Sequence, residues 1–280
     1  MTRPVNVLVA PRMPEPYGPP LLLVAGNRTS VFLERGAAGE RIRKQLRNFA
    51  DVKSERSALF HEASMQLLAA GPGVVPVLGG QLTETIQAHL PTGDAGEFRV
   101  LFRPYLHGHS LRELLSHGAP DAQFLCDNAL LWLGQLAIVL ARIHALRDDH
   151  GATYGLIHRD VTPDNVLLDV NQRIWLNDFG LAHSCARGEV RDDQLLQGSR
   201  PFLPPELAWG EQPTERSDVY QAALLTAVLL DTTRLVRFPH TLEGAQALAR
   251  DPALPGEVRA ALALDPDNRP SSAQLARSLA

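Results

Sequence analysis

Residues 157–181 read IHRDVTPDNVLLDVNQRIWLNDFGL. Two short, largely apolar runs flank a turn-prone centre, a pattern that predicts a β-hairpin. The centre lies between Asn171 and Gln172, which is also the midpoint between Asn165 and Asp178. Antiparallel pairing is therefore predicted to place the Asn165 and Asp178 side chains opposite each other.

An amide oxygen and a carboxylate that converge in this way form a candidate metal site. Hard oxygen ligands suit Mg²⁺, which keeps several waters and shares its other positions with substrate phosphates. Asn165 and Asp178 are therefore the predicted metal ligands. Asp160 precedes Asn165 in a loop that Pro163 stiffens, so it would project toward the same place and accept a proton from an attacking hydroxyl. A loop with solvated polar residues is the alternative, and it requires several independent positions to coincide by chance.

The composition is that of a globular chain with a substantial core. The chain has 280 residues, 45% of them hydrophobic, and a formal net charge of -4. No Lys/Arg block is present, so we expect neither nucleic acid nor an anionic membrane as a partner. Cys126 and Cys185 lie far apart without metal-type spacing, which favours a reducing, cytoplasmic compartment.

The longest apolar stretches favour buried helices over membrane spans. Residues 130–140 and 220–230 are shorter than the roughly eighteen residues that a span needs. The opening MTRPVNVLVAP has no sustained apolar region or small-residue cleavage pattern, so we expect no secretory signal.

Element patterns change from β-rich to helical near Gly108. Residues 1–20 are rich in proline and predict an extended arm. Three strand-like runs follow, and residues 55–70 predict a helix with an apolar stripe and Glu62 at its margin. Two further strand-like runs occupy residues 74–80 and 97–106. The members of the stripe are Leu59, Ala63, Leu67 and Ala70, and the first three strand-like runs are LLLVA (21–25), SVFLER (30–35) and ERIRKQL (40–46).

The motifs resemble those of the protein-kinase superfamily, in particular bacterial Hanks-type serine/threonine protein kinases. HRDVTPDN (158–165) resembles the catalytic loop, and NDFG (177–180) resembles the metal-binding motif. The likeness extends from about Leu21 to the C-terminus. Further similar segments are GSRPFLPPE (198–206) at the end of the activation loop, SDVY (217–220) at the start of the central helix and LDPDNRP (264–270) before the last helices.

The resemblance implies an α+β, bilobal protein-kinase-like fold. We expect an N-terminal extension over residues 1–20, an N-lobe and hinge over residues 21–107, and a C-lobe over residues 108–280. The N-lobe would hold a small antiparallel β-sheet with one helix, and the C-lobe would be larger and mainly helical.

The resemblance also implies roles for individual residues. Asp160 would be the catalytic base, while Asn165 and Asp178 would hold Mg²⁺. Lys44, one of two lysines in the chain, would contact the α and β phosphates of ATP and pair with Glu62. The other implied roles are a pair between Glu206 and Arg269, support of the catalytic loop by Asp218, and an activation-loop sensor at Arg159.

Three segments depart from the family pattern. The nucleotide-covering loop keeps Gly26 and Val31 but lacks the outer glycines. Thr162 stands where a lysine is usual. In the hinge, adenine would use the Pro104 carbonyl and the Leu106 amide. The residue before the hinge, the gatekeeper, is Arg103, or Phe102 if the alignment shifts by one, and the sequence leaves both open.

The activation segment carries few hydroxyl groups. Ser199 resembles a family residue that holds the catalytic loop, and Ser184 lies close to the metal motif. Activity is therefore expected not to need phosphorylation here, with Asp192 or Asp193 supplying the charge for Arg159.

The leading hypothesis is a serine/threonine protein kinase that transfers the γ-phosphoryl group of ATP, with Mg²⁺, to protein hydroxyls. Autophosphorylation and the oligomeric state are left open. The alternatives are a pseudokinase that acts as a nucleotide-binding or scaffolding module, and a small-molecule phosphotransferase.

Overall fold

A computed structural model describes most of the chain, in two compact units. Unit 1 comprises Met1–Ala70 and Val75–Leu106, and unit 2 comprises Gly71–Val74 and His107–Ala280. The predicted arm lies outside the described residues as far as residue 18. The described residues are 19–25, 29–36, 39–46, 52–82, 98–116, 122–147, 151, 153, 155–184, 190, 202–231 and 242–280.

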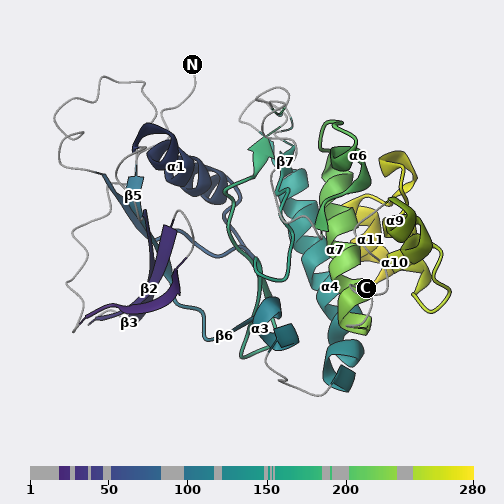
Figure 1. The fold of residues 1–280 in the computed structure, drawn as a ribbon, viewed down its shortest axis with the longest axis horizontal. Helices are drawn as coiled ribbons and strands as arrows, with labels where there is room; N and C mark the ends of the chain where they lie inside the picture. Colours follow the sequence, from purple (N-terminus) through teal and green to yellow (C-terminus); the bar gives the residue numbers. More distant parts are fainter. Residues whose placement is uncertain are drawn as a thin grey trace. The chain divides into compact units, whose positions relative to one another are not determined.

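In the described part of unit 1, a five-stranded antiparallel sheet is accompanied by one helix, α1 (Val52–Leu68) (Figure 1). The three predicted strands from residue 21 to residue 46 are confirmed. The prediction of a strand over 74–80 is mostly wrong, because Pro76 interrupts that run and pairing begins only at Gly79. The strand order is β1-β2-β3-β5-β4, with β1 (Leu21–Ala25), β2 (Thr29–Gly36), β3 (Gly39–Leu46), β4 (Gly79–Leu82) and β5 (Phe98–Pro104).

The core of unit 1 lies between the sheet and α1. Leu59 and Ala63 of α1 pack with Leu46 and Leu101 of the sheet, and all four are buried. This confirms the first half of the predicted apolar stripe. The second half is wrong at Ala70, which is exposed and follows the end of the helix.

Unit 2 is mainly helical. Its long helices α4 and α7 lie side by side, with α10 and α11 packed against them (Figure 1). A three-stranded sheet of order β6-β8-β9 and a two-stranded sheet of β7 and β10 complete it. The helices are α3 (Leu111–Ser116), α4 (Ala122–His144), α6 (Pro205–Ala208), α7 (Glu215–Leu230), α9 (Leu242–Ala249), α10 (Gly256–Ala261) and α11 (Ser272–Ser278), with a 3-10 turn at Pro266–Asn268. The strands are β6 (Gly108–Ser110), β7 (Leu156–Ile157), β8 (Val166–Asp169), β9 (Ile174–Leu176) and β10 (His183–Ser184). A β-rich unit with one helix and a mainly helical unit confirm the predicted fold class.

Helix α4 is longer than the apolar stretch in its sequence suggested. Its 23 residues are long and apolar enough to cross a membrane by length and composition. Half of its most apolar window is buried inside the unit, where Leu133, Leu140 and Ile143 are almost inaccessible to solvent. Core helices share this property.

The hairpin of β8 and β9 forms as predicted, but its register differs by one residue. Val166 pairs with Leu176 and Leu168 with Ile174, so the centre is Asn171. Asn165 therefore lies opposite Asn177, and the prediction that it lies opposite Asp178 is wrong. An odd number of residues connects the paired positions of the two strands, so the turn contains an added bulge residue. Gln172 adopts the positive φ of 59° that such a turn requires.

Asp169 stabilises this turn. Its Oδ1 accepts hydrogen bonds from the backbone N–H groups of Asn171 at 2.8 Å and Arg173 at 3.0 Å. Its Oδ2 accepts one from the indole N–H of Trp175 at 3.1 Å. Burial by itself raises the pKa of Asp169, but these hydrogen bonds outweigh it and the pKa is lowered.

A buried ion pair joins distant segments of unit 2. Arg269 donates to both carboxylate oxygens of Glu206, at 2.8 and 2.7 Å, and its guanidinium stacks over Tyr220. Both charged side chains are almost fully buried, which confirms the predicted pair. Burial raises the pKa of Tyr220 to about 12, against the opposing effect of the Arg269 charge.

We predict that Arg269→Met lowers the free energy of unfolding by about 3–5 kcal/mol, because it leaves the Glu206 carboxylate buried without its cation. Urea denaturation of the full chain measures this. Arg277→Met is the matched control, since Arg277 is exposed in the same C-terminal region. A loss for Arg269→Met no larger than that for Arg277→Met would contradict the prediction.

Candidate active site

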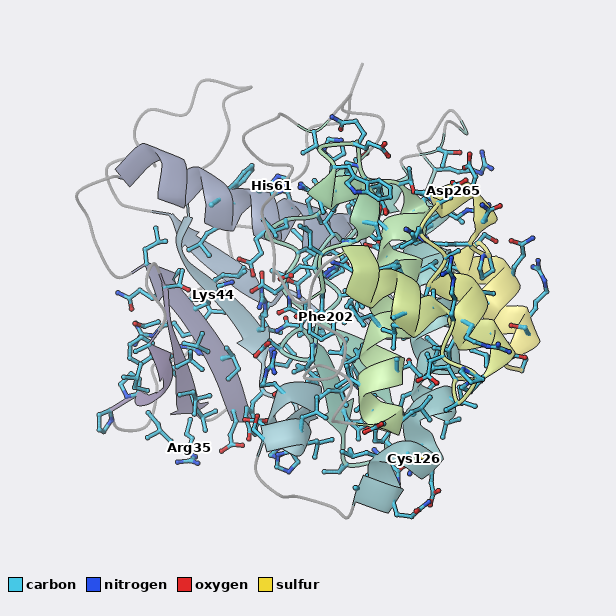
Figure 2. The ribbon with its side chains drawn as sticks, turned by 45° about the vertical axis from the view of Figure 1, so that its right-hand side comes forward. Arg35, Lys44, His61, Cys126, Phe202 and Asp265 are labelled. Atoms are coloured by element: carbon cyan, nitrogen blue, oxygen red, sulfur yellow. The ribbon has the colours of Figure 1, made fainter. Side chains whose placement is uncertain are left out.

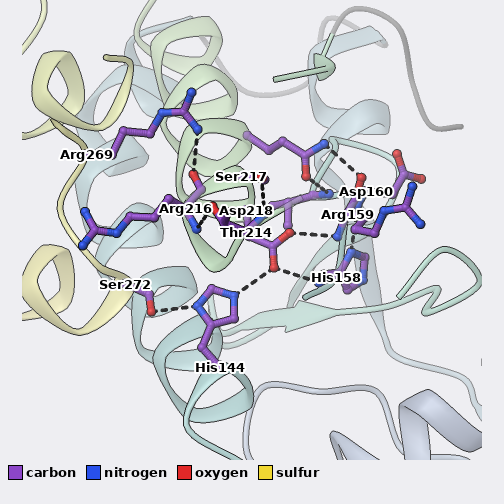
Figure 3. Close-up of polar contacts among 12 residues, drawn as sticks. His144, His158, Arg159, Asp160, Thr214, Arg216, Ser217, Asp218, Arg269 and Ser272 are labelled. Carbon is purple, nitrogen blue, oxygen red and sulfur yellow. Dashed lines mark hydrogen bonds and ion pairs between the residues drawn. The ribbon is translucent and has the colours of Figure 1, made fainter. Parts of the chain in front are cut away.

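Asp218, near the start of α7, binds the backbone of the loop at residues 158–161. One carboxylate oxygen of Asp218 accepts from the His158 backbone N–H and the other from the Arg159 N–H, each at 2.8 Å. The ring of His144 completes the set, with its Nε2 2.9 Å from Asp218 (Figure 3). Asp218 is fully buried, so its charge is stabilised by these donors. The predicted support of the loop is confirmed.

Gln221, one turn further along α7, holds the next part of the loop. Its Oε1 accepts from the Val161 N–H at 3.0 Å, and its Nε2 donates to the carbonyl oxygens of Arg159 and Phe202. Two side chains of one helix thus bind the backbone of three loop residues, His158, Arg159 and Val161. Neither Gln221 nor His144 was identified from the sequence. The spacing of Asp218 and Gln221 on one helical face was a signal that could have found Gln221.

These contacts hold the backbone of Arg159 in an unusual conformation. Its φ is 69°, in the left-handed region that non-glycine residues adopt at a cost of roughly 1–3 kcal/mol. Burial lowers the pKa of Arg159, and the nearby charges of Asp218 and Asp160 oppose the shift. Its Nη1 also donates to the Leu181 carbonyl at 3.3 Å. The loop therefore turns at Arg159 and presents Asp160.

His158 links this loop to the end of the hairpin. Its Nε2 lies 3.0 Å from the Asn177 carbonyl oxygen and donates to it, and its Nδ1 accepts from the Asp160 N–H. The ring packs edge-on against Phe179, with centroids 4.6 Å apart. The buried histidine thereby fixes Asp160 relative to the segment that carries Asp178.

Asp160 and Asn165 are in direct contact, which agrees with the prediction that Asp160 projects toward the place of Asn165. Asn165 Nδ2 donates to the Asp160 carboxylate at 2.7 Å and to the Asp160 carbonyl at 2.9 Å. Because the amide nitrogen is used in this way, the amide oxygen of Asn165 is left as the acceptor that a cation can use. The donor set therefore fits a hard divalent cation.

Asp178 directly follows the residue that pairs with Asn165. The backbone N–H of Asn177 donates to the Asn165 carbonyl at 2.9 Å. Asp178 itself has a positive φ of 57°, and its Oδ1 accepts from the Gly180 N–H at 3.2 Å. The chain turns at Asp178 immediately after the hairpin ends, so both predicted metal ligands lie at the open end of the hairpin even though they are not opposite each other.

Unit 1 carries the second predicted group, Lys44 and Glu62. Lys44 Nζ donates to the two carboxylate oxygens of Glu62 at 3.0 and 2.9 Å. Lys44 lies in the middle of β3, and its side chain is only 13% exposed (Figure 2). Val31 of β2 pairs with Lys44 in register, so the two side chains share one face of the sheet. The predicted ion pair is confirmed.

The sheet register decides between the two gatekeeper candidates. Lys44 pairs with Leu101, so Leu101 and Arg103 lie on the Lys44 face and Phe102 lies on the opposite face. Phe102 there stacks under the guanidinium of Arg41, 4.5 Å from the ring centroid. Arg103 is buried on the face toward α1 and forms an ion pair with Glu62. Arg103, and not Phe102, therefore occupies the position beside Lys44.

The remaining predicted residues differ in how far the structure describes them. Leu106 is half-buried at the end of unit 1, and its role stays a prediction. Thr162 is fully buried, and its hydroxyl has no hydrogen-bond partner among the described residues. Ser184 lies in β10 and is almost fully buried. Gly26, Asp192, Asp193 and Ser199 lie outside the described residues.

Comparison with known proteins assigns the family. A profile of the protein kinase domain matches residues 42–277 of the chain. The chain belongs to the protein kinase domain family.

Several curated kinases resemble this kinase-family chain. It is 34% identical over 184 residues to a probable serine/threonine-protein kinase of Streptomyces coelicolor, covering 60% of this chain and 26% of that protein. It is 30% identical over 216 residues to the serine/threonine-protein kinase PDK1 of Cryptococcus neoformans, covering 75% and 16%. It is 29% identical over 203 residues to the serine/threonine-protein kinase PknB of Mycolicibacterium smegmatis, covering 66% and 31%. The matches thus span less than a third of the length of these relatives.

We predict that Asp218→Asn speeds amide hydrogen exchange at His158 and Arg159 by about tenfold or more. The asparagine offers one oxygen in place of two, so a buried N–H loses its acceptor at a cost of roughly 1–3 kcal/mol. Exchange measured by mass spectrometry or NMR reports this without any substrate. Asp127→Asn, on the exposed side of α4, removes the same charge and is expected to leave these amides unchanged. Equal exchange in both variants would show that Asp218 does not hold the loop.

Proposed function

We propose that this protein is an ATP- and Mg²⁺-dependent serine/threonine protein kinase. The observation that carries the proposal is the hydrogen bond from Asn165 to the Asp160 carboxylate, which brings the proposed base and a proposed metal ligand together next to the β8–β9 hairpin. Membership of the protein kinase domain family and the serine/threonine specificity in the names of the similar proteins support the substrate class.

In this proposal, each candidate residue of unit 2 and of unit 1 has a role in phosphoryl transfer. Asp160 orients the acceptor hydroxyl and accepts its proton as the oxygen attacks the γ-phosphorus. Lys44 contacts the α and β phosphates, and Glu62 holds the lysine in place. Asn165 and Asp178 would hold Mg²⁺, which supplies charge neutralisation to the phosphates when bound. Catalysis then consists mainly of positioning and electrostatic stabilisation.

The proposal also covers the cellular location of the protein, its partners and its contacts with the nucleotide. The absence of a basic footprint in the composition and the scattered cysteines support a cytoplasmic protein whose partners are other proteins. Val31 and Leu106 are proposed to contact the adenosine part of ATP, together with Gly26.

We predict that Asp160→Asn abolishes transfer of the labelled γ-phosphoryl group to a generic protein substrate. The loss of rate should be about 10²–10⁴-fold, because the amide cannot accept the hydroxyl proton. Asp164→Asn is the matched control: Asp164 lies in the same loop, is exposed, and pairs only at the surface with Arg112. It should retain activity to within a factor of a few.

The outcomes of this assay separate the three functions. Transfer to protein that is lost only in Asp160→Asn establishes the kinase. Tight binding of Mg·ATP without transfer would instead establish a pseudokinase, and label on small hydroxylated or amino compounds alone would establish a small-molecule phosphotransferase.

We also predict that Ser184→Ala retains full activity. The Ser184 side chain is buried in the two-stranded sheet of β7 and β10, where it is inaccessible to a second kinase molecule. Activity and phosphate content of the purified variant, compared with the wild type, measure this. A loss of activity that tracks the loss of a phosphate group would contradict the prediction.

A further inference from the structure

Glu62 of α1 is paired with two cations. Its Oε1 accepts from Lys44 Nζ at 3.0 Å and also from Arg103 Nη2, while its Oε2 accepts from Lys44 at 2.9 Å. All three side chains lie within unit 1, and the Glu62 and Arg103 side chains are 4% and 6% exposed. The cluster therefore holds two positive charges against one negative charge in a buried setting.

Arg103 reaches Glu62 because of the sheet register. It is the penultimate residue of β5, pairs with Ile42 of β3, and lies on the same face as Leu101, which packs against α1. The guanidinium is planar, permanently charged and held by β5, whereas the lysine ammonium ends a flexible stem. Arg103 is thus the more buried of the two partners of Glu62, with a side chain 6% exposed against 13% for Lys44.

The burial of Arg103 is costly. Its Nε has no hydrogen-bond partner among the described residues, and a buried donor without an acceptor costs roughly 1–3 kcal/mol. An apolar side chain at this place would avoid the cost and leave Lys44 and Glu62 as a neutral pair. A stabilising role alone therefore does not account for arginine at position 103.

We propose that Arg103 is a positioning residue that keeps Glu62, and with it α1, docked on the sheet when the Lys44 ammonium is engaged by nucleotide phosphates. A Glu62 carboxylate held by lysine alone would lose part of its only ion pair whenever the phosphates compete for that lysine. With Arg103 present, Glu62 keeps a partner, and Lys44 is shared between Glu62 and the phosphates without releasing α1. The role in nucleotide binding rests on the proposed kinase function.

The same sheet provides a matched control on its other face. Glu34 is buried there and also pairs with two arginines, with Arg41 at 2.7 Å and Arg43 at 2.6 Å. Arg41→Met removes one of two cations from a buried glutamate, as Arg103→Met does, but on the face away from Lys44 and α1.

The first test uses amide hydrogen exchange of α1 in the full chain without nucleotide. Lys44→Met alone should leave the amides around Glu62 protected, because Arg103 still pairs with the carboxylate. Lys44→Met combined with Arg103→Met should speed their exchange by about tenfold or more, since the buried carboxylate then has no cation. Lys44→Met combined with Arg41→Met should behave like Lys44→Met. Equal exchange in Lys44→Met and in the Lys44→Met, Arg103→Met variant would overturn the proposal.

The second test separates positioning from simple stabilisation. Arg103→Met should unfold within a few degrees of the wild type, because Lys44 and Glu62 remain paired, yet its Kd for Mg·ATP should rise about tenfold. Arg103→Lys should restore most of the affinity. An unchanged Kd in Arg103→Met would refute the role in nucleotide binding. If wild-type protein binds no Mg·ATP, the proposed function fails, while the exchange comparison still decides whether Arg103 holds α1.

Discussion

The catalytic loop of this protein depends on one buried carboxylate. Asp218 accepts hydrogen bonds from two successive backbone N–H groups of the loop and contacts the ring of His144, all inside unit 2. The loop bends through a left-handed residue, Arg159, and such a conformation persists only where the surroundings impose it. The direction in which Asp160 points is therefore set by a side chain some sixty residues later in the chain. Phosphoryl transfer relies on such positioning more than on the reactivity of any one group.

The helix α1 presents the opposite electrostatic situation. Asp218 accepts hydrogen bonds from backbone N–H groups, whereas Glu62 pairs with two full charges, one of which is proposed to bind the nucleotide. If a ligand competes for the Lys44 ammonium, Arg103 still pairs with Glu62. The carboxylate is then not left unpaired in a region of low dielectric. The loop is fixed by hydrogen bonds that the proposed reaction would not use, and the helix by an ion cluster that it would use.

Local motifs identified the candidate site residues and the family, whereas the pairing register of the strands could be read only from the structure. The oxygen-bearing residues at 160, 165 and 178 were singled out from their residue types and spacing, and the pair of Lys44 with Glu62 from the resemblance to the kinase family. The hairpin register was not, because the turn uses a left-handed glutamine where sequence rules expect glycine or asparagine. Arg103 was ambiguous because a shift of one residue reverses the face of every side chain on a strand. His144 lies at the end of α4, far from Asp218 in sequence, and no local pattern connects the two.

The buried pair of Glu206 with Arg269 has a consequence for synthesis of the protein. Glu206 emerges from the ribosome 63 residues before its partner, and His144 emerges 128 residues before Ser272, to which it is hydrogen-bonded. Until Arg269 leaves the ribosome, the Glu206 carboxylate lacks its cation in what will become the interior of unit 2. Unit 2 therefore cannot complete these contacts until residues 269–272 have left the ribosome, however early its other helices form.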